Sequence, residues 1–257
     1  MQLSTGMLFC MLFFSFCNVK NGNKEKIKKI SKNHFVLEQY NKESLLTSEQ
    51  EFIMTDTGRM FDGYLKVFYE NGKIMALAFF KNNEQDSVFY SYYENGGLHQ
   101  KEYFFHNERV GPRYIYYENG KINRFDFFTF KNVMIFTLCY NMQGNIDSVK
   151  GHPIYLDIAN EKETYSRNDT VIVDLMLCKP DGVEAVLTLK YLDTAQKWHE
   201  TDIVKFKKYS IADIPYFSFP HFCTDGSAKY VGILSLYDSL TKELVAKDSV
   251  RYNIKIK

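Results

Sequence analysis

Histidines and recurring glutamates are the residues whose types could carry acid–base or metal chemistry. The glutamate column Glu70, Glu94 and Glu118 could in principle supply the two carboxyl groups that a glycosidase needs ~5–9 Å apart. Each of these glutamates stands two residues before a turn glycine, which favours exposed, solubilising side chains over a catalytic pair. The chain has no Cys-x-x-Cys, and none of its six histidines has metal-ligand spacing. It also lacks a phosphate-binding loop, a Gly-x-Ser-x-Gly elbow and a His-Glu-x-x-His motif. We therefore expect a protein that is not an enzyme and holds no metal or cofactor. The histidines are His34, His99, His106, His152, His199 and His221.

These glutamates belong to an internal repeat of 24 residues. Tyr-Glu-Asn-Gly occurs at 69–72, 93–96 and 117–120, and a degenerate fourth copy ends near Ile146. Self-similarity at a fixed period indicates stacked supersecondary units. The glycines of the four copies are expected to be turn residues: Gly72, Gly96, Gly120 and Gly144.

Asn-Gly between aromatic-rich runs predicts a β-hairpin with a two-residue type I′ turn. With that turn, Glu70 lies opposite Lys73, Tyr69 opposite Ile74, and Val67 opposite Ala76. In the third copy, Arg113 lies opposite Asp126. The same register brings apolar or oppositely charged partners together in both copies.

Aromatic residues recur at the same two positions of each copy, and they are the candidate binding residues. Two interpretations remain open: all of them are core, or some form an exposed surface that docks a partner. The six candidates are Tyr69, Phe80, Tyr93, Phe104, Tyr117 and Phe128.

The unit Gly-x-x-x-x-Tyr-Tyr-Glu-Asn-Gly-Lys-[Ile/Leu], as at 111–122, resembles the bacterial MORN-type repeat. It is similar to the repeats of the YwqK-family antitoxin proteins over residues of about 63–146. The resemblance implies a β-hairpin repeat protein without assigned catalytic residues. The antitoxin label implies neutralisation of a toxin by protein binding.

After Gly151 the period is lost, but strand patterns continue. Seven short strands in the last hundred residues predict a two-sheet sandwich of the immunoglobulin or fibronectin kind. Cys178 and Cys223 would lie at opposite ends of that sandwich, so we expect no bridge between them. The fold class is thus all-β: a meandering antiparallel sheet of 24-residue β-hairpin repeats followed by a seven-stranded Ig-like sandwich.

The domain organisation follows from these patterns. We expect a signal peptide at 1–19, a Lys-rich tether at 20–50, the hairpin array at 51–150 and the sandwich at 151–257. The fourth copy carries the apolar run Met134–Cys139, which is too apolar for an exposed edge strand. We predict that the sandwich packs against it, although burial within the array itself is the alternative.

Residues 7–17 form an uncharged run that fits a signal-peptide core and is too short to span a bilayer, which takes ~20 apolar residues. Three alternatives remain open: a plain cleaved signal, a lipid-modified Cys17, or an uncleaved start. The expected location is the periplasm or cell envelope of a Gram-negative bacterium. Membrane contact is expected only through a lipid anchor at Cys17.

Charge and composition narrow the class of partner. The formal net charge is +1, but six lysines and one glutamate lie in residues 20–32, so the remainder carries 26 basic and 30 acidic groups, a net of −4. Nucleic-acid binding needs a basic face, so we expect a protein partner. Two functions remain open: an exported, non-catalytic binding or scaffold protein, or an antitoxin-like inhibitor that neutralises its partner by binding.

An Asp-Ser/Thr pair followed by a small or aliphatic residue recurs six times. It resembles the acceptor motif of a general O-glycosylation system, and plain turn chemistry explains the same pairs. The candidate acceptors are Ser87, Ser148, Thr170, Thr194, Ser239 and Ser249.

Overall fold

The computed structural model describes residues 24–159, 165–166, 170–192, 197–203, 207–208, 215–222 and 228–254. The expected signal peptide, Cys17, Thr194 and Cys223 lie outside these residues. Every regular element described is a β-strand, and the described residues contain no helix that could cross a membrane. The chain divides into two compact parts. The first comprises the residues up to 84 together with 94–96, and the second comprises 85–93 and the residues from 97 on.

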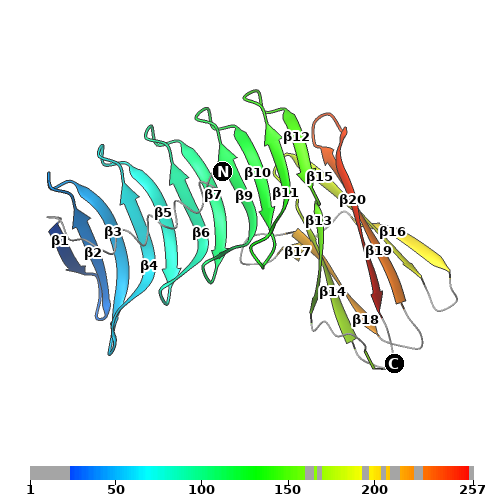
Figure 1. Cartoon of the computed structure of the whole chain (residues 1–257), viewed down its shortest axis with the longest axis horizontal. Coiled ribbons are helices and arrows are strands. Elements are labelled where there is room, and N and C mark those ends of the chain that lie inside the picture. The colour runs from blue at the N-terminus through cyan, green and yellow to red at the C-terminus, as the bar shows by residue number, and fades with distance from the viewer. Residues whose placement is uncertain are drawn as a thin grey trace, which may run out of the picture. The chain divides into compact units, whose positions relative to one another are not determined.

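In the first part, antiparallel strands follow one another in chain order (Figure 1). They are β1 (Lys24–Lys29), β2 (His34–Tyr40), β3 (Leu46–Thr55), β4 (Gly58–Phe68) and β5 (Ile74–Lys81). The expected tether at 20–50 is therefore wrong from residue 24 on, because β1, β2 and the start of β3 occupy it. All six side chains of β1 are exposed, which is compatible with its four lysines. The Lys28 ammonium pairs with the buried Glu38 carboxylate of β2.

The second part holds the remaining strands of the hairpin array, apart from Glu84, the first residue of β6, which belongs to the first part. They are β6 (Glu84–Tyr92), β7 (Leu98–Phe105), β8 (Glu108–Arg109), β9 (Gly111–Tyr116), β10 (Ile122–Phe128), β11 (Met134–Tyr140) and β12 (Ile146–Gly151). They too are antiparallel in chain order, except that β8 and β9 both pair with β7. The expected all-β sheet of hairpins is confirmed.

Two four-stranded sheets complete the second part, with orders β13-β14-β18-β17 and β16-β15-β19-β20. Their strands are β13 (Ile154–Ala159), β14 (Thr170–Leu177), β15 (Val183–Leu192), β16 (Trp198–Ile203), β17 (Lys207–Lys208), β18 (Pro215–Phe222), β19 (Ala228–Asp238) and β20 (Leu244–Ile254). The two-residue β17 adds an eighth strand to the seven expected. Cys178 is buried and free, and the prediction that it forms no bridge with Cys223 stays a prediction because Cys223 lies outside the described residues.

The two C-terminal sheets, β13 to β20, are called the sandwich below. One buried apolar cluster contains residues of the sandwich and of the end of the array. Phe136 and Leu138 of β11 are at most 1% exposed and belong to the same cluster as Leu177, Val183 and Leu187 of the sandwich. Met134 of the same apolar run is exposed. Because the cluster also contains Phe125 and Phe127 of the array, cover of the run Met134–Cys139 by the sandwich stays a prediction.

The Tyr-Glu-Asn-Gly turns have three loop residues, so the type I′ prediction is wrong. The Tyr69 amide donates to the Lys73 carbonyl, and the Gly72 amide donates to the Tyr69 carbonyl, both at 2.9 Å. Gly72 has a φ of 80°, whereas Asn71 is not among the residues of positive φ. This is a type I turn followed by a glycine bulge. The bulge places Phe68, and not Tyr69, opposite Ile74, and leaves Glu70 in the loop.

Beyond the bulge, the predicted register is right. Val67 lies opposite Ala76, and Arg113 lies opposite Asp126. Consecutive positive φ angles of the type I′ kind occur instead at the other ends of the strands, at Asn82-Asn83 and His106-Asn107.

Candidate binding surface

The recurring tyrosines of the repeat bind backbone of the next copy. The Tyr93 hydroxyl donates to the Tyr116 carbonyl at 2.6 Å, and the Tyr117 hydroxyl donates to the Tyr140 carbonyl at 2.8 Å. A phenol long enough to reach the next hairpin is needed for this bond, which gives the tyrosine column a structural role.

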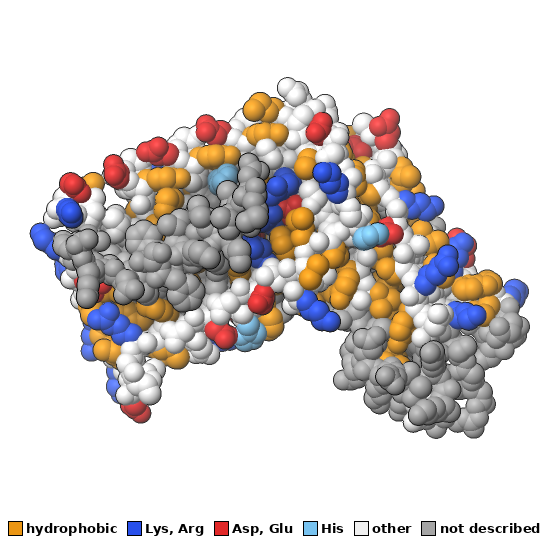
Figure 2. Space-filling view, viewed as in Figure 1, with side chains coloured by type: hydrophobic (Ala, Val, Ile, Leu, Met, Phe, Trp, Pro, Cys, Tyr) orange, Lys and Arg blue, Asp and Glu red, His pale blue; other side chains and the backbone are white. Residues whose placement is uncertain are grey.

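The asparagines and lysines that recur at the turns also bind backbone of the next copy. The Asn71 side chain accepts from the Lys73 amide and donates to the Glu94 carbonyl, at 3.0 and 3.3 Å. The Lys73 ammonium donates to the Asn95 carbonyl at 2.8 Å. Asn119 and Lys121 make the equivalent contacts two copies later. These contacts between copies explain the recurrence of Tyr, Asn and Lys in the motif. The recurring glutamates Glu70, Glu94 and Glu118 are exposed at the turns, where Figure 2 shows acidic side chains.

The six candidate aromatics do not form an exposed surface. Phe104 and Phe128 are 4% and 7% exposed, and the Arg109 guanidinium lies 5.6 and 5.7 Å from their ring centroids. The other four are half-buried: Tyr69, Phe80, Tyr93 and Tyr117. The expectation that this set provides docking rings is wrong for Phe104 and Phe128, because burial removes them from contact with a partner.

A different set of aromatic rings lies on one face of β6, β7 and β9. Tyr90 lies opposite Lys101, and Lys101 lies opposite Tyr114, so these three share a face. Residues two apart on a strand also share a face, which adds the neighbouring tyrosines of each strand. We call the half-buried members the tyrosine surface: Tyr90, Tyr92, Lys101, Tyr103 and Tyr116.

The rings of this surface pack in pairs along the strands. Tyr90 and Tyr92 stack with centroids 6.4 Å apart, and Tyr114 and Tyr116 stack at 6.3 Å. Tyr114 itself is 7% exposed and belongs to the core cluster shared with the sandwich. Tyr103 and Tyr116 of the tyrosine surface pack against this same cluster, so the surface is continuous with it.

Lys101 supplies the charge of the tyrosine surface. Its ammonium lies 5.2 Å from the centroid of the Tyr103 ring. Burial works to lower the pKa of Lys101, but the hydrogen bond with the Tyr103 hydroxyl and the nearby Tyr90 and Tyr116 hydroxyls outweigh it and raise that pKa. Burial raises the pKa of Tyr92 and Tyr116. The surface thus groups the phenol rings of Tyr90, Tyr92, Tyr103 and Tyr116 around one ammonium, and no carboxylate of the described residues forms an ion pair with that ammonium.

Sequence reasoning overlooked this surface although its signal was present. Tyr92 and Tyr116 stand one residue before the tyrosine column, and Tyr103 stands one residue before Phe104. Adjacent strand residues point to opposite faces, so the doublets Tyr92-Tyr93 and Tyr103-Phe104 place one ring on each face. The period alone does not say which face is covered.

Three glutamates do gather in a surface pocket of the first part, lined also by lysines of β1 and β4. Each has a donor of its own. Glu38 pairs with Lys28 and accepts from the Tyr40 hydroxyl at 2.7 Å, and Glu49 lies 3.4 Å from the Lys66 ammonium. Glu51 accepts from the Tyr64 amide at 3.2 Å. The hydrogen bond from Lys28 lowers the pKa of Glu38, which keeps it ionised and makes it a poor general acid.

The candidate glycosylation residues fall in different surroundings. Thr170 and Ser249 are exposed, whereas Ser87, Ser148 and Ser239 are half-buried. Ser87 also has a φ of 61° and donates to the Asp86 carboxylate at 2.9 Å. Modification of these residues stays a prediction.

Two segments match a known family model. Residues 61–82 and 109–124 match the MORN repeat variant. Both segments contain a glycine at the start of the copy, namely Gly63 and Gly111, and lie within the hairpin array. No curated protein matches the chain.

Among solved structures, the chain is similar to TarM. One is a mutant of S. aureus TarM in complex with Fondaparinux, alpha-GlcNAc-glycerol and UDP, at 15% identity and a TM-score of 0.24. A second TarM crystal structure has 15% identity and a TM-score of 0.23. Each match covers 59% of this chain and 24% of the other, so the chain spans about a quarter of those proteins. TM-scores this low carry no structural argument.

Proposed function

We propose that this chain is an exported, non-catalytic scaffold that binds a protein partner through the tyrosine surface. The observation that carries the proposal is the group of half-buried phenols around Lys101, whose ammonium pairs with no described carboxylate. Tyrosine rings provide large contact area with few rotatable bonds and are enriched in protein interfaces. The surface also continues the face that the sandwich already covers at Tyr114.

The expected partner places apolar side chains on the phenol rings and a carboxylate on Lys101. A charge that is partly desolvated at an interface favours a partner of opposite sign, because burying it unpaired is costly. Replacing Lys101 with Glu reverses the charge without removing the rings, and is expected to abolish binding through this surface.

The test is site-specific photocrosslinking in native cells, with the crosslinking amino acid in place of Tyr92 and the compartment recorded. A control places it at Ser249, an exposed residue of the sandwich. We expect one discrete crosslinked protein from position 92, none from position 249, and loss of the product on adding Lys101→Glu. Equal crosslinking from both positions, or a product unaffected by Lys101→Glu, would contradict the proposal.

An antitoxin-like inhibitor is the alternative, favoured by the repeat motif at 61–82 and 109–124. Both functions use protein binding, so the compartment separates them. Fractionation that finds the native protein only in the cytosol would exclude the exported scaffold. A partner that is toxic on its own would identify the inhibitor.

We also propose that residues 151–257 form an immunoglobulin-like sandwich. With β13, β14 and β15 as strands A, B and C, the order β13-β14-β18-β17 corresponds to A-B-E-D, and β16-β15-β19-β20 corresponds to C′-C-F-G. That division of strands between sheets is the immunoglobulin arrangement. An experimental structure in which β18 pairs with β15 instead of β14 would overturn the assignment.

A further inference from the structure

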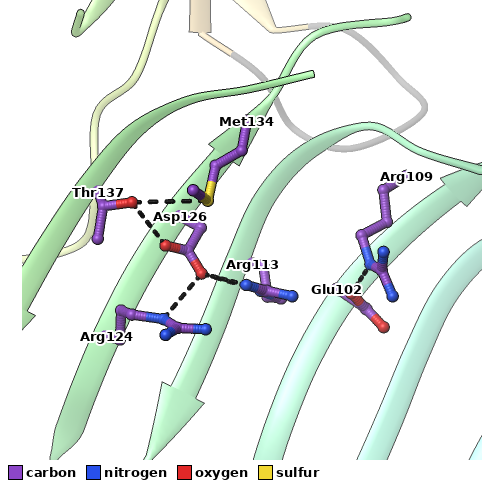
Figure 3. A network of polar contacts seen from close by, with 7 residues as sticks. All are labelled: Glu102, Arg109, Arg113, Arg124, Asp126, Met134 and Thr137. Carbon is purple, nitrogen blue, oxygen red and sulfur yellow. Dashed lines mark hydrogen bonds and ion pairs between the residues drawn. The ribbon is translucent and has the colours of Figure 1, made fainter. Parts of the chain in front are cut away.

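A buried ion network occupies the face of the array opposite the tyrosine surface. Arg113 precedes Tyr114 on β9, so its side chain leaves the other face of the sheet. There it lies opposite Asp126 of β10, which lies opposite Thr137 of β11. Figure 3 shows these side chains converging on the Asp126 carboxylate, with the Glu102–Arg109 pair beside them.

The Asp126 carboxylate is saturated with donors. Its Oδ2 accepts from Arg113 Nε at 2.9 Å, from Arg113 Nη2 at 2.5 Å and from Arg124 Nε at 3.0 Å. Its Oδ1 accepts from the Thr137 hydroxyl at 2.8 Å. The Asp126 side chain is 1% exposed, so these contacts replace water that the carboxylate gives up on folding.

The charges of this network do not balance. Glu102 pairs with Arg109 through a 2.6 Å contact, which leaves two guanidinium groups against the single Asp126 carboxylate, a net charge of +1. The excess is at Arg124, whose side chain is 39% exposed, against 13% for Arg113. Arg124 reaches Asp126 with Nε, and its terminal Nη1 and Nη2 have no hydrogen-bond partner among the described residues.

We propose that Arg124, held in place by Asp126, binds a carboxylate side chain of a partner protein. A guanidinium presents two parallel N–H groups that match a carboxylate in a bidentate pair. Anchoring through Nε fixes the orientation of these groups before binding, which lowers the entropic cost of the contact. The net charge of +1 is matched by one carboxylate, whereas a phosphate dianion would leave the group with a net charge of −1. This site lies on the opposite face from the tyrosine surface and does not rest on the function proposed above.

The test uses N-acetyl-glutamate amide as the probe and its neutral isostere N-acetyl-glutamine amide as the control. Both are titrated into the ¹⁵N-labelled full chain, and the arginine side-chain N–H resonances are followed at constant ionic strength. We expect the glutamate probe to shift the Arg124 resonance saturably, with an affinity at least about tenfold above that of the glutamine control. Inorganic phosphate, the third arm, is expected to bind more weakly than the glutamate probe.

Two variants separate the site from general charge effects. Arg124→Gln is expected to lose the saturable shifts of neighbouring resonances, and Arg124→Lys to weaken binding several-fold, because lysine keeps the charge but loses the bidentate geometry. The variant Tyr90→Ala is expected to bind the probe like the wild type, whatever its effect on partner crosslinking from position 92. Equal shifts with both probes, tighter binding of phosphate, or retained binding in Arg124→Gln with a native spectrum would each overturn the proposal.

Discussion

Gly151 lies so close to Ile135 that an added Cβ atom would stand 2.1 Å from the Ile135 carbonyl oxygen. The amide of the next residue, His152, donates to that same oxygen at 2.7 Å. The close approach brings the chain out of β12 and into the sandwich. Backbone is what the added atom would meet, so no side-chain rotation relieves the contact.

Gly151→Ala is therefore expected to destabilise the protein by about 3 kcal/mol or more, since it combines this contact with a φ of 85°. The matched control is Gly72→Ala, which has a φ of 80° but nothing within 4 Å of the added atom. The control isolates the cost of the left-handed backbone, ~1–2 kcal/mol. Urea unfolding measures both, and equal losses in the two variants would show that the contact with Ile135 relaxes without cost.

Tyr117→Phe removes the hydroxyl that donates to the Tyr140 carbonyl. Loss of one hydrogen bond between hairpins is expected to cost about 1 kcal/mol. Tyr64→Phe serves as control, because Tyr64 is 46% exposed and its hydroxyl has no hydrogen-bond partner among the described residues. In thermal unfolding, the midpoint of Tyr117→Phe should lie below that of the wild type, and the midpoint of Tyr64→Phe should equal it. Indistinguishable midpoints would mean that the tyrosine column is retained for another reason.

Ser87→Gly is expected to stabilise the protein by about 1 kcal/mol. Ser87 has a φ of 61° at the place where Gly63 and Gly111 stand in the neighbouring copies. A non-glycine residue with positive φ costs ~1–3 kcal/mol of backbone strain, which glycine removes. The greater flexibility of glycine in the unfolded chain offsets ~0.5–1 kcal/mol of that stabilisation. Ser148→Gly, in a strand residue without positive φ, should destabilise instead. A Ser87→Gly variant less stable than the wild type would indicate that the hydrogen bond to Asp86 outweighs the backbone strain.

Tyr140 has a buried hydroxyl without a hydrogen-bond partner among the described residues, and burial raises the pKa of Tyr140 to about 12. The folded state thus holds its proton to higher pH than the unfolded state, whose tyrosine pKa is ~10. Stability from this group is fully present below pH ~10 and is lost as the pH rises towards 12. Tyr140→Phe is expected to be at least as stable as the wild type at pH 7 and to lose less stability between pH 10 and 12. Parallel curves of unfolding free energy against pH would contradict this assignment.

The sequence predicted strand pairing well and loop geometry poorly. The pairs Val67–Ala76 and Arg113–Asp126 follow from matching apolar and charged partners, which depends only on side-chain alternation. The turn type was wrong because Asn-Gly suits both a type I′ turn and a type I turn with a glycine bulge. Hydrogen bonds to the next hairpin, such as that from Asn71 to the Glu94 carbonyl, favour the second.

Burial on a repeat sheet was harder to predict than strand position. Lys24–Lys29 has the composition of a solvated segment, but an edge strand with every side chain exposed has the same composition. Phe104 and Phe128 occupy a regular column, but the Arg109 guanidinium that lies over both rings has no counterpart in the other copies. Tyr103 and Tyr116 of the tyrosine surface pack against a cluster that also contains residues of the sandwich, and this tertiary contact lies outside the repeat.

The last turn of the array differs from the others at the tyrosine column. Asn141 replaces tyrosine there, and its side-chain oxygen accepts from the amides of Gln143 and Asn145 at 3.0 Å within its own turn. In contrast, the Tyr117 hydroxyl donates to a carbonyl in the copy that follows it, at Tyr140. A copy with tyrosine therefore needs a following copy to supply the acceptor for its hydroxyl, whereas the copy with asparagine needs none and ends the series. In evolutionary terms, this array can lengthen by duplication of an internal copy, but a copy appended after Asn141 would meet a neighbour that has no phenol to offer it.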